Sequence, residues 1–287
     1  MKQPMLSPKD RTAIPVDQIA SLGKDDSVFF MGSCFSEEMH LRLLQQQQVS
    51  HSNPFGVIFH PFALQKNLEL IAQAGDRPAF EQALNTKHLY FSQGTFHSLL
   101  HANRFQHPNA DQLIDELFNI AHTALQQLKS AQLICITLGT AWIYKHLPTD
   151  SFVGNCHKLP QQDFQKSLTT NTEIQGNIQG IIAAINQLNP RAELVFTVSP
   201  VRHLRDGVQE NLRSKSTLIT ALNEVIAASK IAAHYFPAYE IIREELNDWH
   251  YYKEDRMHPT AEAIDMVFER FYKACFPTNA STLGAEL

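Results

Sequence analysis

Residues 27–39 read SVFFMGSCFSEEM. The apolar residues 28–31 are typical of a strand buried on both faces of a parallel sheet, and they run directly into Gly32, Ser33 and Cys34. The acidic segment that follows has the apolar spacing of a helix. This stretch therefore predicts a strand that turns at once into a helix, with a hydroxyl and a thiol at the turn.

The same alternation of short apolar runs and amphipathic segments continues along the chain. We expect strands at Val28–Met31, Val57–Phe59, Leu133–Leu138, Leu194–Val198 and Ile231–Phe236. Between them, helical spacing covers 113–128, 174–188 and 218–226, and the last helix is expected to begin at Pro259. Strand and helix alternation of this kind predicts an α/β fold with a doubly wound, mostly parallel sheet.

One segment breaks the rhythm. LYFSQGTFHSLL, residues 89–100, predicts a hairpin that turns at Gln93-Gly94. We therefore interpret residues 75–108 as an insertion beside the sheet. No linker or repeat divides the chain, which predicts a single domain over 1–287 with its core at about 28–272 and a loose tail at 278–287.

The composition restricts the class of protein. The chain has 287 residues, 44% of them hydrophobic, and a formal net charge of -5, whereas proteins built to hold nucleic acid usually carry a basic surplus. No run approaches the roughly 20 apolar residues that span a bilayer. The N-terminus lacks the apolar core of a secretory signal, and the four cysteines make no disulfide framework. We expect a reduced, cytoplasmic protein with neither nucleic-acid nor membrane partners.

Ligands of doubly wound sheets bind outside the carboxyl ends of the strands, and chemically capable residues gather there. Ser33 follows the first strand, and Asp255 and His258 lie three apart before the last helix. A serine becomes a nucleophile when a base takes its proton and a third group orients that base. The alternative is that Ser33 and Asp255 only cap helices.

Longer motifs extend this interpretation. The chain resembles the GSCFA-domain proteins, which belong with the SGNH/GDSL-like hydrolases, and the resemblance spans residue 28 to about 272. FMGSCFSEE at 30–38 matches the naming motif, except that Ser36 replaces its final alanine. Further blocks are NPFG at 53–56, TLGTAW at 137–142, NCHK at 155–158, TVSPVRH at 197–203, YFPAYEI at 235–241 and EDRMHP at 254–259.

The resemblance implies a three-layer α/β/α fold of the flavodoxin-like, SGNH-hydrolase type and a serine esterase or acyltransferase site. Ser33 matches the nucleophile, and Asp255 and His258 match the Asp-x-x-His of the last block. The N–H groups of Ser33 and Gly56 match oxyanion donors. The superfamily's third block carries an oxyanion asparagine where this chain has Ala141.

That departure leaves one oxyanion donor unassigned. Thr140 or Asn155 could supply it. Gly139, His157, Arg202 and His203 lie in the same blocks, and we expect them to line a substrate pocket; for Arg202 and His203, bonding to backbone carbonyls is an equal alternative.

Two rival chemistries are possible, a cysteine nucleophile and a metal site. Cys34 could be the nucleophile, but a thiol that follows a strand more often packs beneath it. His97 and His101 have the i, i+4 spacing of two metal ligands on a helix, but lack the glutamate of a zinc protease motif. We expect no metal and no cofactor.

The sequence thus predicts a serine esterase whose substrate is a small-molecule or glycan ester, most simply an O-acylated carbohydrate. An acyltransferase on the same site is one alternative. A non-catalytic glycan- or protein-binding module is another, motivated by the missing asparagine. The sequence does not indicate an oligomeric state.

Overall fold

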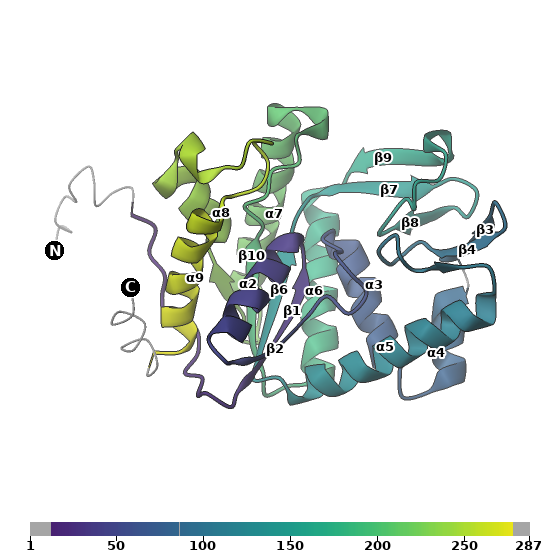
Figure 1. Cartoon of the computed structure of the whole chain (residues 1–287), viewed down its shortest axis with the longest axis horizontal. Helices are drawn as coiled ribbons and strands as arrows, with labels where there is room; N and C mark the ends of the chain where they lie inside the picture. The colour runs from purple at the N-terminus through teal and green to yellow at the C-terminus, as the bar shows by residue number, and fades with distance from the viewer. Residues whose placement is uncertain (1–12, 86, 278–287) are drawn as a thin grey trace.

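The computed structural model describes residues 13–85 and 87–277, and a five-stranded parallel sheet forms its centre (Figure 1). The spatial order of the strands is β11-β10-β6-β1-β2, with every neighbouring pair parallel. The strands are β1 (Ser27–Gly32), β2 (Val49–Ser52), β6 (Leu133–Leu138), β10 (Glu193–Val198) and β11 (His234–Phe236). Counted within this sheet alone, the order is 2-1-3-4-5, which is the flavodoxin-like doubly wound order. The predicted α/β fold class is confirmed.

Helices cover both faces of the sheet, because its central strands are apolar on both sides. On β1, Val28 and Phe30 pack into one core cluster with α2 and α9, whereas Phe29 and Met31 pack into the other with α3, α5, α6 and α7. Figure 1 shows α2 and α9 on one side of the sheet and α3, α5 and α6 on the other. The helices are α2 (Cys34–Gln45), α3 (Pro61–Ala72), α4 (Arg77–Asn85), α5 (Ala110–Ser130), α6 (Asn171–Leu188), α7 (Val208–Ala228), α8 (Ala238–Glu240) and α9 (Ala261–Cys275).

The strand order reverses between β1 and β6. From β1 the chain continues to β2 on one side, and from β6 it continues to β10 on the other. The segments that leave the carboxyl ends of these two neighbouring strands diverge, and such a switch point is where doubly wound sheets bind ligands. Ser33 and Gly139 are the residues that follow β1 and β6 at this point.

The prediction for the second strand is wrong. Residues 57–59 form no strand, and β2 is the polar segment Val49–Ser52 at the edge of the sheet. An edge strand needs only one paired side and can be polar, so its sequence lacks the unbroken apolar run of a central strand. The backbone of 57–59 bonds across the strand ends instead, since Ile58 donates to the Gly32 carbonyl (3.2 Å) and Phe59 accepts from the Gly139 N–H (2.8 Å).

The last strand and the last helix both start later than predicted. β11 begins at His234 rather than Ile231. α9 begins at Ala261 because Thr260 caps it, with Oγ1 accepting the N–H of Ala263 at 3.3 Å. Pro259 therefore precedes the cap and forms an isolated antiparallel bridge with Tyr252.

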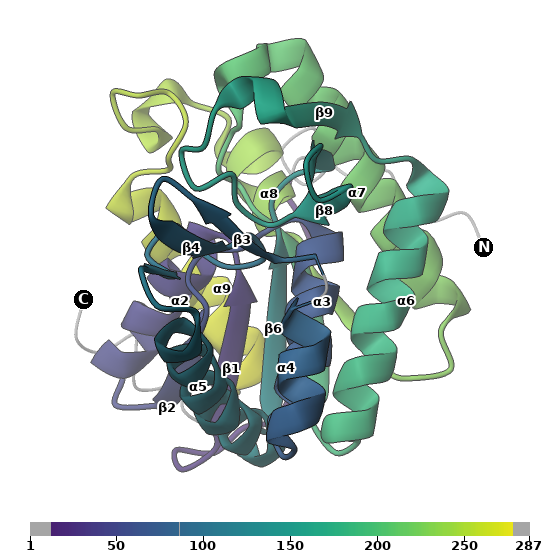
Figure 2. The same cartoon turned by 90° about the vertical axis from the view of Figure 1, so that its right-hand side faces the viewer.

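Two small antiparallel sheets lie beyond the carboxyl ends of β1 and β6 (Figure 2). One contains β3 (Leu89–Ser92), β4 (Thr95–Ser98) and β5 (Gln106–His107). Its hairpin turns at Gln93 and Gly94, whose φ values of 51° and 81° suit a tight turn, as the sequence predicts. The other, which the sequence interpretation missed, contains β7 (Trp142–His146), β8 (Ser151–Val153) and β9 (Phe164–Leu168).

The domain assignment stays a prediction. The N-terminal residues 1–12 and the tail 278–287, which we expect to be loose, lie outside the described residues. None of the helices in the described part is both long and apolar enough to cross a membrane.

Candidate active site

Ser33 lies between β1 and α2 and is the N-cap of that helix. Its Oγ accepts the N–H of Phe35 at 3.2 Å, and 2% of the residue is exposed. The strands approach closely here because Gly32, at φ 144°, has no Cβ; one placed there would lie 2.2 Å from the carbonyl oxygen of Thr137 on β6. The capping alternative is therefore realised in this structure. Capping uses a lone pair of the hydroxyl, so its proton can still be donated to a base.

The loop before α9 holds the predicted carboxylate next to the predicted imidazole. Asp255 Oδ2 lies 2.7 Å from His258 Nδ1, and Asp255 Oδ1 accepts the N–H groups of Met257 at 2.8 Å and His258 at 2.9 Å. The backbone N–H and the ring of His258, together with the Met257 N–H, hold the pKa of Asp255 well below its usual range. An ionised carboxylate can only accept, so Nδ1 donates and Nε2 is left available as a base.

Arg202 fixes the position of this loop. Its N–H donates to the carbonyl of Met257 at 3.0 Å, and its Nη1 donates to the carbonyl of Arg256 at 3.1 Å. The guanidinium also packs on the rings of Trp249 (5.1 Å) and Tyr252 (5.7 Å). Because Arg202 follows β10, these contacts bring the His258 loop to the carboxyl edge of the sheet. They match the backbone-bonding alternative for this arginine.

Ser33 and His258 are not joined directly. The hydrogen bonds of residues 13–85 and 87–277 include none between Ser33 Oγ and His258 Nε2. Burial, followed by the charge of Lys215, lowers the pKa of the neighbouring His203 to about 3. Unliganded sites often hold their reacting groups farther apart than the complex does.

The two predicted backbone oxyanion donors already have acceptors. The Ser33 N–H donates to the Thr137 carbonyl at 3.2 Å, and the Gly56 N–H donates to the Asn53 carbonyl at 2.8 Å. Asn53 also accepts the Gly32 N–H through Oδ1 at 2.8 Å, so it ties the Gly56 turn to the end of β1. In this structure both groups maintain the turn.

Thr140 and Asn155, the two side chains predicted as oxyanion donors, differ in how far their polar groups are already hydrogen-bonded. The Thr140 hydroxyl is 3.0 Å from Ser214 Oγ and accepts the Trp142 N–H at 3.1 Å. Asn155 Oδ1 accepts the N–H of His157 at 2.8 Å, but its amide nitrogen has no hydrogen-bond partner among the described residues. Asn155 is therefore the better available donor of the two.

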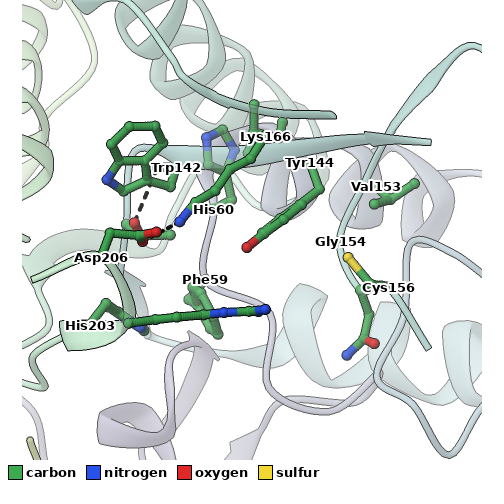
Figure 3. Close-up of a pocket in the computed structure, with 14 residues that line it drawn as sticks. Phe59, His60, Trp142, Tyr144, Val153, Gly154, Cys156, Lys166, His203 and Asp206 are labelled. Carbon is green, nitrogen blue, oxygen red and sulfur yellow. Dashed lines mark hydrogen bonds and ion pairs between the residues drawn. The ribbon is translucent and has the colours of Figure 1, made fainter. Parts of the chain in front are cut away.

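A cavity of about 300 Å³ opens beside these segments (Figure 3). Of the predicted site residues, Thr140, Asn155 and His203 line it; Gly139, Ser33 and His258 do not. The other lining residues are Phe59, His60, Trp142, Ile143, Tyr144, Val153, Gly154, Cys156, Lys166, Arg205 and Asp206. Most of the walls thus come from the small β7–β9 sheet, which the sequence interpretation did not identify as a sheet, and from the segment after β10, which contains the predicted His203.

An ion pair lies across the aromatic wall of the cavity. Lys166 pairs with Asp206, and its ammonium group lies 4.7 Å from the Trp142 ring and 5.6 Å from the Tyr144 ring (Figure 3). This lysine covers the two aromatic faces on which a sugar ring could stack.

His157 follows the cavity residues Asn155 and Cys156 and does not itself line the cavity. Its Nε2 donates to the carbonyls of Ser98 (2.7 Å) and His101 (3.1 Å), and burial lowers its pKa to about 4. His101 Nδ1 pairs with Ser98 Oγ at 2.6 Å. His97 lies on strand β4, so His97 and His101 do not share the helix face that the metal alternative required.

The thiols near the site are in their neutral form. Burial, followed by the charge of Glu37, raises the pKa of the Cys34 thiol, and burial raises that of Cys156 to about 11. A thiol acts as a nucleophile in its thiolate form. This environment disfavours Cys34 as the nucleophile.

Two polar residues of α7 were missed by the sequence interpretation. Lys215 is fully buried and donates to the carbonyls of Gly139 at 2.6 Å and Ser199 at 2.7 Å. Ser214 precedes it and bonds Thr140 and Ala141. The available signal was that Lys215 shares a helix face with the buried Leu218 and Leu222, where a charged residue is unexpected.

A family model described as the GSCFA family matches residues 27–271. No curated protein sequence matches the chain closely enough to count as a relative.

Solved structures with a similar arrangement include three esterases. A carbohydrate esterase family 3 protein from Talaromyces cellulolyticus has a TM-score of 0.43 at 7% identity, over 90% of this chain and 98% of its own. An acetyl xylan esterase, Est2A, from the rumen bacterium Butyrivibrio proteoclasticus has a TM-score of 0.43 at 9% identity, and the match covers 94% of this chain and 66% of the esterase. A family two carbohydrate esterase from Clostridium thermocellum, in complex with cellohexaose, has a TM-score of 0.40 at 11% identity, and the match covers 95% of this chain and 67% of the esterase.

Proposed function

Because the chain belongs to the GSCFA family, whose model matches residues 27–271, we propose that it is a serine hydrolase that acts on ester bonds. The observation that carries the proposal is the Asp255–His258 pair, at 2.7 Å, on a loop bonded to the end of β10. Ser33 follows β1 at the same carboxyl edge of the sheet. A carboxylate-oriented imidazole near a strand-end serine is the arrangement that acyl transfer requires.

The proposed reaction has two steps. Ser33 Oγ attacks the acyl carbonyl carbon while His258 Nε2 takes the hydroxyl proton. The tetrahedral intermediate collapses when His258 returns that proton to the leaving alcohol oxygen, which leaves the acyl group on Ser33. Water then attacks the acyl carbon while His258 takes its proton, and His258 returns that proton to Ser33 Oγ as the bond to the acyl group breaks and the acid leaves. Asp255 keeps the proton on Nδ1 and stabilises the imidazolium in both steps.

Substrate binding must bring the nucleophile to its base. The Ser33 hydroxyl bonds the Phe35 N–H at 3.2 Å in the structure described here. A rotation about χ1 would redirect it, and α2 would lose one capping bond, which costs about 1 kcal/mol. That cost is small beside the barrier reduction of an esterase.

The oxyanion has two available donors. The N–H of Cys34, the first residue of α2, has no acceptor inside the helix, and helix N-termini favour negative charge. The amide nitrogen of Asn155 is the second, and it lies at the cavity. Recruiting the N–H of Ser33 or Gly56, which the family resemblance implies, would require each to leave a backbone carbonyl.

The substrate that we propose is an O-acylated, most simply O-acetylated, carbohydrate. The cavity of about 300 Å³ is at the small end of ligand sites and suits one sugar-sized group. The rings of Trp142 and Tyr144 offer stacking faces, and Asn155 and His203 add polar groups for hydroxyls. Lys166 must move aside from the rings before a sugar can stack on them.

A non-catalytic binding module is the second candidate. It is favoured by one observation, that Ser33 is almost fully buried and bonds the Phe35 N–H. An acyltransferase on the same site is a variant of the first candidate, in which an acceptor alcohol replaces water.

The test is a panel of p-nitrophenyl esters combined with covalent labelling. A fluorophosphonate probe should label the wild type and Cys34→Ala at residue 33, as peptide mass spectrometry can show, and Ser33→Ala should stay unlabelled. Cys34→Ala should retain activity within about tenfold of the wild type, because its thiol takes no part. Unchanged turnover by Ser33→Ala would exclude the proposal, and a wild type without turnover or labelling would favour the binding module. Acceleration by an added sugar, with formation of the acylated sugar, would indicate the acyltransferase.

A further inference from the structure

Lys215 joins the ends of the two strands at the middle of the sheet. Gly139 follows β6 and Ser199 follows β10, and the Lys215 ammonium group donates to both of their carbonyls, at 2.6 and 2.7 Å. The side chain comes from α7 and is fully buried. A buried amine is costly to maintain, so its retention here requires an explanation beyond packing.

Ser214 and Lys215 together fix Gly139, Thr140 and Ala141, the segment that departs from the third block of the superfamily. Ser214 Oγ accepts the Ala141 N–H at 2.7 Å and lies 3.0 Å from the Thr140 hydroxyl. Because Lys215 also bonds Gly139, the turn of α7 that carries Ser214 and Lys215 holds Gly139, Thr140 and Ala141. The position that carries an asparagine in related hydrolases is thereby fixed by backbone and hydroxyl contacts.

The charge of Lys215 has no carboxylate beside it. None of the ion pairs within residues 13–85 and 87–277 includes this lysine. The titratable groups that face it are Cys34 on α2, His203 after β10 and Tyr239 on α8, whose ring lies 5.8 Å away. Both Cys34 and His203 are neutral at pH 7. Burial and the carboxylate of Glu37, in the first turn of α2, raise the pKa of Cys34, and the Lys215 ammonium group opposes that effect.

We propose that Lys215 is a positioning residue of the esterase site, which holds the ends of β6 and β10 together and supplies a positive charge beside the turn that carries Ser33. The inference rests on the proposed function. The charge acts through the surroundings of Ser33: it favours the negative oxygen that forms during attack. A neutral amine would keep both hydrogen bonds but lose this effect.

The protonation of Lys215 should change near neutral pH. Burial lowers its pKa to about 7, against about 10.4 for an exposed lysine. Hydrolysis should therefore decline above pH 7. The unfolded chain binds the Lys215 proton up to higher pH than the folded chain does, so the stability contributed by this group rises from pH 7 to pH 10.

The first experiment does not depend on activity. Urea denaturation gives the unfolding free energies of the wild type and of Lys215→Met at pH 7 and pH 9.5. Between these two pH values the wild type should gain stability relative to the variant. Arg213→Met removes an exposed cation from the same helix and should track the wild type. Parallel pH dependences of Lys215→Met and the wild type would overturn the inference even if the chain hydrolyses no ester.

The second experiment uses p-nitrophenyl acetate, with the uncatalysed rate subtracted. At pH 6.5 we expect kcat of Lys215→Met to fall about 10- to 100-fold and its decline above pH 7 to disappear. Lys215→Gln keeps a donor without the charge, and it should resemble Lys215→Met in its pH profile. A purely structural role would instead let glutamine restore kcat with the alkaline decline intact. A wild type with no decline above pH 7 would also overturn the inference, whether or not the variants fold.

Discussion

The turn at Ser33 and the loop of His258 form the two sides of the proposed triad, and they are built in different ways. Ser33 is 2% exposed and is held by the sheet itself, through the N–H bond to Thr137 and the close approach at Gly32. The His258 side chain is 43% exposed and is held by Asp255 and by backbone bonds within its own loop.

The comparison shows that different contacts hold the two sides in place. The serine side needs the whole sheet, so local changes there disturb folding and chemistry together. The histidine side depends on a few bonds within its loop and on those from Arg202, and removing one of them should alter the reaction while the fold persists. The predictions below test that division.

The largest effect should come from the reacting groups themselves. Ser33→Ala removes the proposed nucleophile and His258→Ala removes the proposed base, and we expect each to lower kcat by about 10⁴- to 10⁶-fold. Steady-state kinetics on one p-nitrophenyl ester, after circular dichroism confirms folding, would measure this. If His258→Ala keeps near-wild-type activity, the proposed triad is wrong and His203 or His157 becomes the first candidate for the base.

Asp255→Asn should have a smaller effect, about 10²- to 10³-fold in kcat, although loss of an orienting aspartate can cost about 10⁴. The backbone bonds of the loop, including that from Lys253 to the His258 carbonyl at 2.8 Å, supply part of the ring's placement. The same assay compares Asp255→Asn with His258→Ala. Equal losses in the two variants would mean that the carboxylate alone positions the ring.

Buried histidines beside the cavity should make the stability of the protein sensitive to acid. Burial lowers the pKa of His101 to about 3 and of His157 to about 4, below the 6.5 or so of an unfolded histidine. Their neutral forms therefore give full stability above about pH 6.5, and it is lost as pH falls toward 4 because the unfolded chain binds the protons first. By pH 5.5 each such histidine should cost about 1 kcal/mol of unfolding free energy.

Urea denaturation at pH 7.5 and 5.5 would measure this loss. The exposed His250, which pairs with Glu262 at 2.9 Å, provides the control, since His250→Gln should leave the pH dependence nearly unchanged. His101→Gln should reduce the loss of unfolding free energy between pH 7.5 and pH 5.5. A wild type equally stable at both pH values would show that the buried histidines do not control acid sensitivity.

The smallest effect is expected from Arg202→Met. The variant loses the bond to the Arg256 carbonyl but keeps the backbone bond to Met257, so the loop should loosen without unfolding. We expect kcat to fall about tenfold with little change in KM. A rise in KM with unchanged kcat would instead show that Arg202 binds substrate, as the sequence first suggested.

The sequence predicts the central part of the molecule well for a physical reason. β1, β6 and β10 are buried on both faces, so their residues form unbroken apolar runs, and the triad candidates lie at strand ends or before a helix. β2 was missed because an edge strand can be polar. The cavity wall from β7–β9 was missed because its antiparallel pairs, such as Trp142 with Leu168, join residues too distant for local spacing to relate.

Lys215 shows a different limit. Its residue type is that of a helix surface, and its position on the apolar face signals only that something is unusual. The two carbonyls that receive its bonds come from segments 76 and 16 residues away. Only the packing of α7 over the ends of β6 and β10 brings them together.

The close approach at Gly32 has a consequence for how this protein can evolve. Every single-nucleotide change of a glycine codon that alters the residue introduces a Cβ, and here that atom would meet the Thr137 carbonyl at 2.2 Å, on a backbone whose φ of 144° L-residues rarely adopt. In a saturation library selected for soluble, folded protein, we therefore expect position 32 to accept almost no other residue. Variation that tunes the proposed activity would have to enter through the exposed loop of His258 or the walls of the cavity.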